Sequence, residues 1–365
     1  MKDEQAIQKH RMAGLDILRI ICALLIFMRH SITMFGCTYV IPHLDGLVVQ
    51  LTNPVMSTFF IISGFSLYYS YHGKPELSTE SAVIFYKKRM ITILPPYFLL
   101  HILWLFSSSD SVARWIVLTP FELTGLQSMY TNIFGILHNG GTWFISCLAI
   151  SYFIFPLVRG LIDRLSHNGK LFALIAAVLL IVYIMCVDVY FQLGDNYTNP
   201  IFRAIEFFIG LVLMATLISA RRQNISVRKQ IILMLFAAVS VIVFLYCLTS
   251  NTLLIYSSIS KSNLLLYPII VIMLVAFYYW RCTFLENSRP LKYLSALSYY
   301  FFLMQFITWN LTQIIMNVVG TKGNEWKLLL SFAVCLVLSI TSKCVIDKLV
   351  RSIRKSANRR SGLKI

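Results

Sequence analysis

Apolar residues run along this chain of 365 residues in long blocks, and short polar connections separate the blocks. A helix needs about 20 apolar residues to cross the hydrocarbon core of a bilayer, and ten blocks approach that length. They cover residues 13–35, 51–71, 88–107, 142–161, 171–191, 200–219, 231–249, 263–280, 293–318 and 327–348. The pattern predicts an all-α polytopic membrane protein with about ten transmembrane helices.

Composition agrees with this prediction. Hydrophobic residues make up 58% of the chain and charged residues only 13%, with a mean hydropathy of +0.73, which excludes an ordinary soluble domain. The eight cysteines are scattered singly, without the paired spacing of a zinc site or a disulfide framework. We therefore expect no metal site.

The formal net charge of +17 reflects how lysine and arginine are distributed between the spans. With a cytoplasmic N-terminus, 25 of the 32 basic residues fall on the cytoplasmic side, five on the other side, and Arg19 and Arg29 within the first span. Cytoplasmic connections carry most lysine and arginine in membrane proteins, so we expect both termini in the cytoplasm. The basic excess indicates topology and contact with the lipid bilayer, and not a nucleic-acid partner.

A single membrane domain is expected over residues 1–350, followed by a short basic cytoplasmic tail at 351–365, in which KSANRRSGLKI (355–365) is expected to be disordered. The longest connection, 108–141, contains the partly apolar stretch WIVLTPFELTGL. This stretch is expected to lie in the membrane interface or to re-enter the membrane.

The first span, LDILRIICALLIFMRH at residues 15–30, contains four ionisable residues: Asp16, Arg19, Arg29 and His30. A charge at the centre of a bilayer costs roughly 3 kcal/mol or more, so these side chains must face the protein interior or a water-filled space. Eleven residues of helix make three turns plus roughly 20° and about 16 Å. Arg19 and His30 therefore share a face, whereas Arg29 points roughly 100° from His30.

Five short sequence stretches, taken in their order along the chain, form a recognisable pattern. They are the Arg, ten residues, His spacing of the first span, FFIISGFSL at 59–67, KKRMITILPPYF at 87–98, TWFISCLAISYFIFPLV at 142–158 and LSALSYYFFLMQ at 294–305. Together they resemble the acyltransferase 3 family of bacterial integral membrane enzymes. Two positions depart from the family pattern: Thr92 stands where a second arginine often follows Arg89, and Gln305 stands where a histidine is common.

The resemblance implies an O-acyltransferase in a bacterial cytoplasmic membrane. Such an enzyme moves an acyl group, usually acetyl, from cytoplasmic acyl-CoA to a hydroxyl of an extracytoplasmic polysaccharide, glycolipid or cell-wall precursor. No permanently bound cofactor is expected, and polysaccharide-synthesis machinery is an expected partner.

His30 is the candidate general base because the pKa of histidine lies close to neutrality. Direct transfer and an acyl-histidine intermediate both remain open at this stage. Arg19 lies nearer the cytoplasm, where its fork of donors suits an oxygen of the coenzyme. Asp16 and Arg29 are candidate supporting residues. The alternative is structural: an Asp16–Arg19 ion pair fixes helix packing and His30 is a core histidine.

Other polar residues fall at the depth of His30. Glu206 in the sixth span is expected to orient His30, or to pair with Arg29 or Arg203. His101 in the third span is an alternative base. These residues predict a polar cluster in the outer half of the membrane.

Further residues are candidates for substrate binding. Lys88 and Arg89 stand at the cytoplasmic mouth, where they either attract coenzyme phosphates or form an ordinary topology-determining charge run. Ser63 and Gly64 allow close helix approach and are expected to line the cavity. Trp143 either stacks on a sugar or anchors in the outer aromatic belt, and we favour the anchor.

A second class of function is a transporter that exports a sugar or lipid, because buried charges in many spans also suit translocation. A third is a non-catalytic partner of a polysaccharide synthase. Transfer that depends on a thioester donor distinguishes the enzyme from both.

Overall fold

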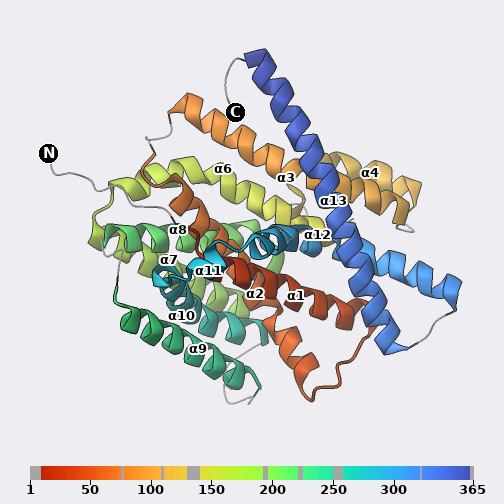
Figure 1. The fold of residues 1–365 in the computed structure, drawn as a ribbon, viewed down its shortest axis with the longest axis horizontal. Helices are drawn as coiled ribbons and strands as arrows, with labels where there is room; N and C mark the ends of the chain where they lie inside the picture. The colour runs from red at the N-terminus through yellow and green to blue at the C-terminus, as the bar shows by residue number, and fades with distance from the viewer. Residues whose placement is uncertain are drawn as a thin grey trace.

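The protein is described by a computed structural model that covers residues 10–74, 78–107, 111–129, 140–191, 196–220, 225–249, 258–320 and 323–361 (Figure 1). In this part of the chain regular structure is entirely helical. The α-helices are α1 (Ala13–Phe35), α2 (Leu44–Tyr71), α3 (Thr79–Ser107), α4 (Val112–Leu123), α6 (Trp143–Arg164), α7 (His167–Phe191), α8 (Pro200–Ser219), α9 (Val227–Thr249), α10 (Ser258–Tyr279), α11 (Thr283–Glu286), α12 (Arg289–Val319) and α13 (Asn324–Ser361). Two short 3₁₀ helices span Gly140–Thr142 and Asn196–Thr198.

Within the described residues nine helices are long and apolar enough to cross a membrane: α1, α2, α3, α6, α7, α8, α9, α12 and α13. The tenth predicted span lies in α10, whose apolar stretch Leu265–Tyr279 is shorter. The prediction of an all-α polytopic membrane protein is confirmed. Several spans are longer than predicted; α2 has 28 residues and α12 has 31. Helices of that length tilt or project from the bilayer.

The centre of the bundle is the crossing of α2 and α8, the most extensive contact between two helices in the described residues. A side chain at Gly64 would collide with the carbonyl oxygen of Phe207, and one at Gly210 would collide with the carbonyl oxygen of Ile61. Each glycine therefore lets one backbone rest directly on the other, as small residues do where membrane helices cross closely. The close helix approach expected at Gly64 is therefore present, and its place in a substrate cavity stays a prediction.

Helix boundaries follow local chemistry. Asn199 begins α8 by accepting hydrogen bonds from the backbone N–H groups of Ile201 and Phe202, and Pro200 follows in the first turn. Gly36 ends α1 with a φ of 63°, a conformation that glycine adopts without strain. The end of α1 is therefore fixed less than two turns after His30.

The C-terminal helix is longer than the sequence suggested. The stretch KSANRRSGLKI at 355–365 was expected to be disordered, yet α13 continues as helix to Ser361. Its 38 residues correspond to about 57 Å of helix, well beyond the roughly 30 Å of hydrocarbon. Its C-terminal end projects past the other helices (Figure 1).

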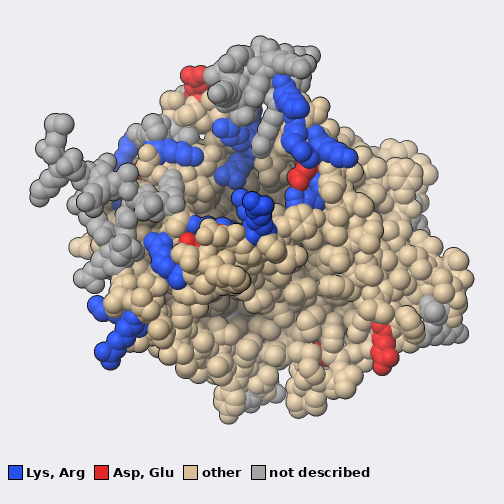
Figure 2. Space-filling view, viewed as in Figure 1, with Lys and Arg blue, Asp and Glu red and all other residues tan. Residues whose placement is uncertain are grey.

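Basic residues are segregated on the molecular surface. On the face in Figure 2, lysine and arginine gather over the upper and left parts, on the side where the N-terminus and the end of α13 lie in Figure 1. The lower right part of this face is mostly uncharged. Lysine and arginine, which the sequence places mainly in alternate connections, therefore also gather on one side of this face of the molecule.

The stretch that was expected at the interface forms α4, a helix of 12 residues. Val112, Ile116 and Leu123 on this helix are exposed, whereas Glu122 is buried. At about 18 Å, α4 is too short to span a bilayer.

Candidate active site

α1 carries both residues of the Arg, ten residues, His spacing and packs mainly against α12 and α2. Arg19 and His30 lie on the helix face that also holds the buried residues Cys22, Ala23 and Ile26. The predicted geometry of the first span is therefore present: a polar stripe directed into the bundle, about 16 Å long.

His30 is held by α12. Its Nδ1 lies 2.7 Å from Oε1 of Gln305, and the amide nitrogen of Gln305 donates to the carbonyl oxygen of Ala23 at 3.3 Å. A backbone carbonyl can only accept, so this second bond fixes which end of the Gln305 amide faces the imidazole. Nδ1 of His30 therefore carries the proton and donates, and Nε2 presents a lone pair in the neutral ring.

Gln305 is completely buried, and the ring of Phe306 packs against the His30 imidazole at 4.8 Å between centroids. The sequence marked Gln305 only as a departure from the family pattern. Its role follows from the register of α12 against α1, which the sequence alone does not supply.

Glu206 has other partners. One carboxylate oxygen accepts from Nη1 of Arg203 at 2.7 Å, and the other accepts from the hydroxyl of Tyr267 at 2.9 Å. Of the predicted alternatives, the structure contains the pair with Arg203 and no hydrogen bond to His30. The expectation that Glu206 orients His30 is corrected, because Gln305 occupies Nδ1.

Arg203 is the centre of a closed polar cluster. It also donates to the side chains of Asn53 and Ser57 and to the carbonyl of Tyr197, and neither Arg203 nor Glu206 has any exposed surface. Trp143 belongs to this cluster: it is 5% exposed and lies 5.9 Å from the Arg203 guanidinium carbon. Trp143 therefore packs inside the protein and not in an exposed aromatic belt, which corrects the anchor interpretation, whereas stacking on a sugar stays a prediction.

Arg19 is less completely paired. Nη1 lies 3.3 Å from Asp16, and Nη2 donates to the Ser66 hydroxyl at 2.7 Å. Asp16 also accepts shorter bonds from Arg11 at 2.7 Å and Ser295 at 2.6 Å. Asp16 therefore ties the start of α1 to α12 and shares its charge between two arginines.

Arg19 is also not fully enclosed by its neighbours, since 30% of its side chain remains accessible. The hydroxyl of Tyr152 on α6 interacts electrostatically with both Arg19 and Arg89. Tyr152 thus connects the first span to the third, a role that the sequence gave no signal to find.

Three cations, from the turn after α2, from α3 and from α6, gather around Tyr71, and we call them the Tyr71 cations. Lys74, Arg89 and Arg159 lie 4.3, 5.9 and 6.0 Å from the ring centroid of Tyr71, respectively. Burial, followed by neighbouring basic side chains, lowers the pKa of the Lys74 ammonium. Arg89 thus lacks a second arginine on α3 but gains neighbours from elsewhere in the fold. Lys88 is exposed beside it.

His101 belongs to a different site. Its Nδ1 lies 3.2 Å from a carboxylate oxygen of Glu122 on α4, and its ring stands edge-on to Tyr97. Ser63 donates to the carbonyl of Phe59 within its own helix. Among the side chains that the structure describes, no group of histidine, cysteine and carboxylate residues has the arrangement of a metal site.

Comparison with known families decides the identity. The family model Acyl_transf_3, described as an acyltransferase domain, matches residues 12–347, nearly the whole chain. The chain belongs to this acyltransferase family. No curated protein and no solved structure matches it. The resemblance read from the five stretches is thereby confirmed, and the protein is a multi-pass membrane acyltransferase.

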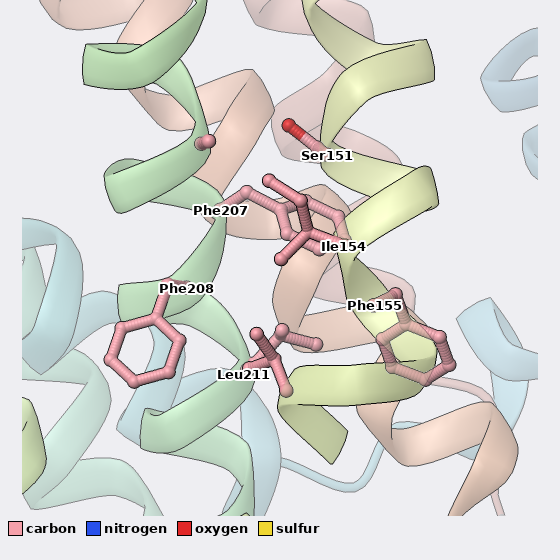
Figure 3. A pocket seen from close by; sticks show the side chains of 8 residues that line it. Ser151, Ile154, Phe155, Phe207, Phe208 and Leu211 are labelled. Atoms are coloured by element: carbon pink, nitrogen blue, oxygen red, sulfur yellow. The ribbon is translucent and has the colours of Figure 1, made fainter. Parts of the chain in front are cut away.

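A pocket of this acyltransferase lies between α6 and α8 (Figure 3). Phe207, Phe208 and Leu211 line one side, and Ile154 and Phe155 the other. The Ser151 hydroxyl at its edge is engaged with the carbonyl of Cys147. No titratable side chain lines the pocket, so it offers no base for acyl transfer.

Proposed function

We propose that this acyltransferase moves an acyl group, most readily acetyl, from cytoplasmic acyl-CoA to a hydroxyl of an extracytoplasmic polysaccharide, glycolipid or cell-wall precursor. His30 acts as the general base. The observation that carries the proposal is the bond from Nδ1 of His30 to Gln305, because it directs the basic Nε2 away from α12.

The donor site is proposed at the opposite end of the α1 stripe. Lys74, Arg89 and Arg159 supply positive charge for the coenzyme phosphates. Arg19 and Tyr152 lie between this cluster and the membrane interior, where they can bind oxygens of the pantetheine arm. The stripe of about 16 Å is comparable with part of an extended pantetheine.

The chemical step is a single displacement at the thioester. Nε2 of His30 takes the proton from the acceptor hydroxyl as its oxygen attacks the thioester carbonyl carbon. The C–O ester bond forms and the C–S bond breaks. The coenzyme leaves as a thiol after it receives the proton that His30 took up, so the histidine ends in its starting state.

We propose a bacterial cytoplasmic membrane as the location, with both termini in the cytoplasm. The distribution of lysine and arginine along the chain supports this orientation. It places the Tyr71 cations at the cytoplasmic side, where acyl-CoA is available, and His30 in the outer half.

The proposal is tested by mass analysis of surface and secreted glycans from cells that lack the gene. The cells are complemented with wild type, His30→Ala or Arg19→Ala, and the membrane level of each protein is measured. We expect an ester-linked acyl mass that returns with wild type and not with His30→Ala. Purified protein should also release free coenzyme from acetyl-CoA when acceptor is present.

Full restoration of the ester by His30→Ala would exclude His30 as the base and bring His101 forward. If no ester depends on the gene in cells that express it, the acyl-transfer proposal fails and export of the glycan becomes the alternative.

A further inference from the structure

Arg29, next to His30 on α1, has an unusual environment. Its Nε and Nη1 are buried, and neither has a hydrogen-bond acceptor in the described part of the chain. The residue as a whole is partly exposed, but removing these two donors from water without a partner costs free energy, so they have hydrogen-bonding capacity left for another group. Arg203, by contrast, has its acceptors supplied by its neighbours.

Arg29 lies at the edge of the buried face of α1. Seven residues separate it from Cys22, which puts the two within about 20° on the helix, and Cys22 is 2% exposed. Arg29 as a whole is partly exposed. It points roughly 100° from His30, yet its guanidinium interacts electrostatically with the imidazole. A ligand that reaches His30 can therefore also meet Arg29.

Three described carboxylates are already engaged with other partners. Glu206 pairs with Arg203, Glu122 lies against His101, and Asp45 accepts from the backbone N–H of Tyr39. Arg29 also lies ten residues of helix, about 15 Å, beyond Arg19, and so away from the end of α1 at which the donor site is proposed.

We propose that Arg29 binds an oxygen anion at the level of His30. The inference rests on the proposed function and adds a second residue to the same site. Two sources share this chemistry. One is a carboxylate or phosphate group of the acceptor, which the planar fork of an arginine recognises. The other is the oxyanion that forms on the thioester carbonyl when the hydroxyl attacks.

The test compares Arg29→Met, Arg29→Lys and the matched control Leu25→Met, which lies one turn away on α1. Binding is measured without any turnover: sodium sulfate serves as the probe, and thermal unfolding of the purified protein is followed against sodium chloride at equal ionic strength. We expect sulfate to raise the Tm of wild type and Leu25→Met by several degrees more than that of Arg29→Met. An equal sulfate response in Arg29→Met overturns the proposal.

Activity then identifies the source of the anion. We expect Arg29→Met to lower ester formation per folded molecule at least tenfold, with Arg29→Lys retaining more activity. If release of coenzyme from acetyl-CoA to water falls in parallel, the anion is the reaction's own oxyanion. If it stays unchanged, the anion belongs to the acceptor. Wild-type ester formation by Arg29→Met contradicts the proposal.

Failure of the acyl-transfer proposal is recognised separately, because wild type itself would then form no ester. The difference in sulfate response between wild type and Arg29→Met would still decide whether Arg29 binds an anion.

Discussion

Two groups of buried charges in this acyltransferase differ in how completely they are paired. Arg203 and Glu206 on α8 have no exposed surface, and α2, α8 and α10 supply their partners. Arg19 on α1 keeps 30% of its side chain accessible, and Arg29 has two buried nitrogens without acceptors in the described chain. The first group is closed, and the second is open to a ligand.

The comparison separates structural from functional charges inside a membrane. A charged side chain in a span is usually taken as a functional candidate, and both groups meet that criterion. Only their hydrogen bonds distinguish them. A closed group stabilises one arrangement of helices, whereas an open group has capacity left for substrate.

The largest effect is expected from a substitution that breaks the closed group of Arg203 and Glu206. Arg203→Met leaves the Glu206 carboxylate buried without its cation, and breaking a buried pair costs about 3–5 kcal/mol. We expect a strong fall in membrane level and in thermal stability in detergent, with ester formation per folded molecule unchanged. Arg19→Met is the matched variant, and it should show the reverse. If both variants lose activity without losing stability, the distinction between the groups is invalid.

A second variant, Gly210→Ala, disturbs the crossing of α2 and α8 around the closed group without changing a charged residue. At Gly210, even one methyl group would collide with the Ile61 carbonyl, so Gly210→Ala must separate α8 from α2. Overpacking costs about 1–3 kcal/mol, and we expect a lower unfolding temperature in detergent. Ala215→Gly on the same helix, which removes a methyl group, serves as a control for general sensitivity of α8. A Gly210→Ala protein as stable as wild type would show that the crossing is looser than described.

The smallest effect is expected from a substitution at Gln305, which tests how His30 is held beside the open group. Gln305→Leu removes the acceptor of Nδ1 of His30, so the imidazole is no longer held in one tautomer. We expect kcat to fall about tenfold, or about 1.4 kcal/mol, while KM for acetyl-CoA stays unchanged. Gln305→Glu, which still offers an acceptor to Nδ1, should recover part of the loss. Equal kcat in wild type and Gln305→Leu would remove Gln305 from the mechanism.

The sequence predicted the helices well because membrane spans depend on length and apolar composition, which are local properties. It also placed Arg19 and His30 on one face, because helix geometry fixes their angle. It could not choose among the partners that it offered Glu206. Arg203 lies on the same helix, but the bond of Tyr267 to Glu206 and the bond of Gln305 to His30 depend on how α10 and α12 pack. Trp143 was misread for the same reason.

The end of α13 shows another limit. Hydropathy marks where a helix leaves hydrocarbon and not where it ends, so the polar, basic stretch KSANRRSGLKI at 355–365 suggested a disordered tail. The helix continues to Ser361 because its hydrogen bonds lie within the helix itself and need no apolar surroundings.

The most direct test compares His30→Gln with Glu206→Gln in the same cells, with ester formation measured per folded molecule. Both variants keep an uncharged polar side chain. If the polar residues of α1 serve catalysis and the closed group of Arg203 and Glu206 serves stability, His30→Gln should lose about a hundredfold or more in ester formation. Its membrane level should stay normal. Glu206→Gln should lose stability and keep its activity per folded molecule. Full activity in His30→Gln, or loss of activity at normal stability in Glu206→Gln, would contradict this assignment.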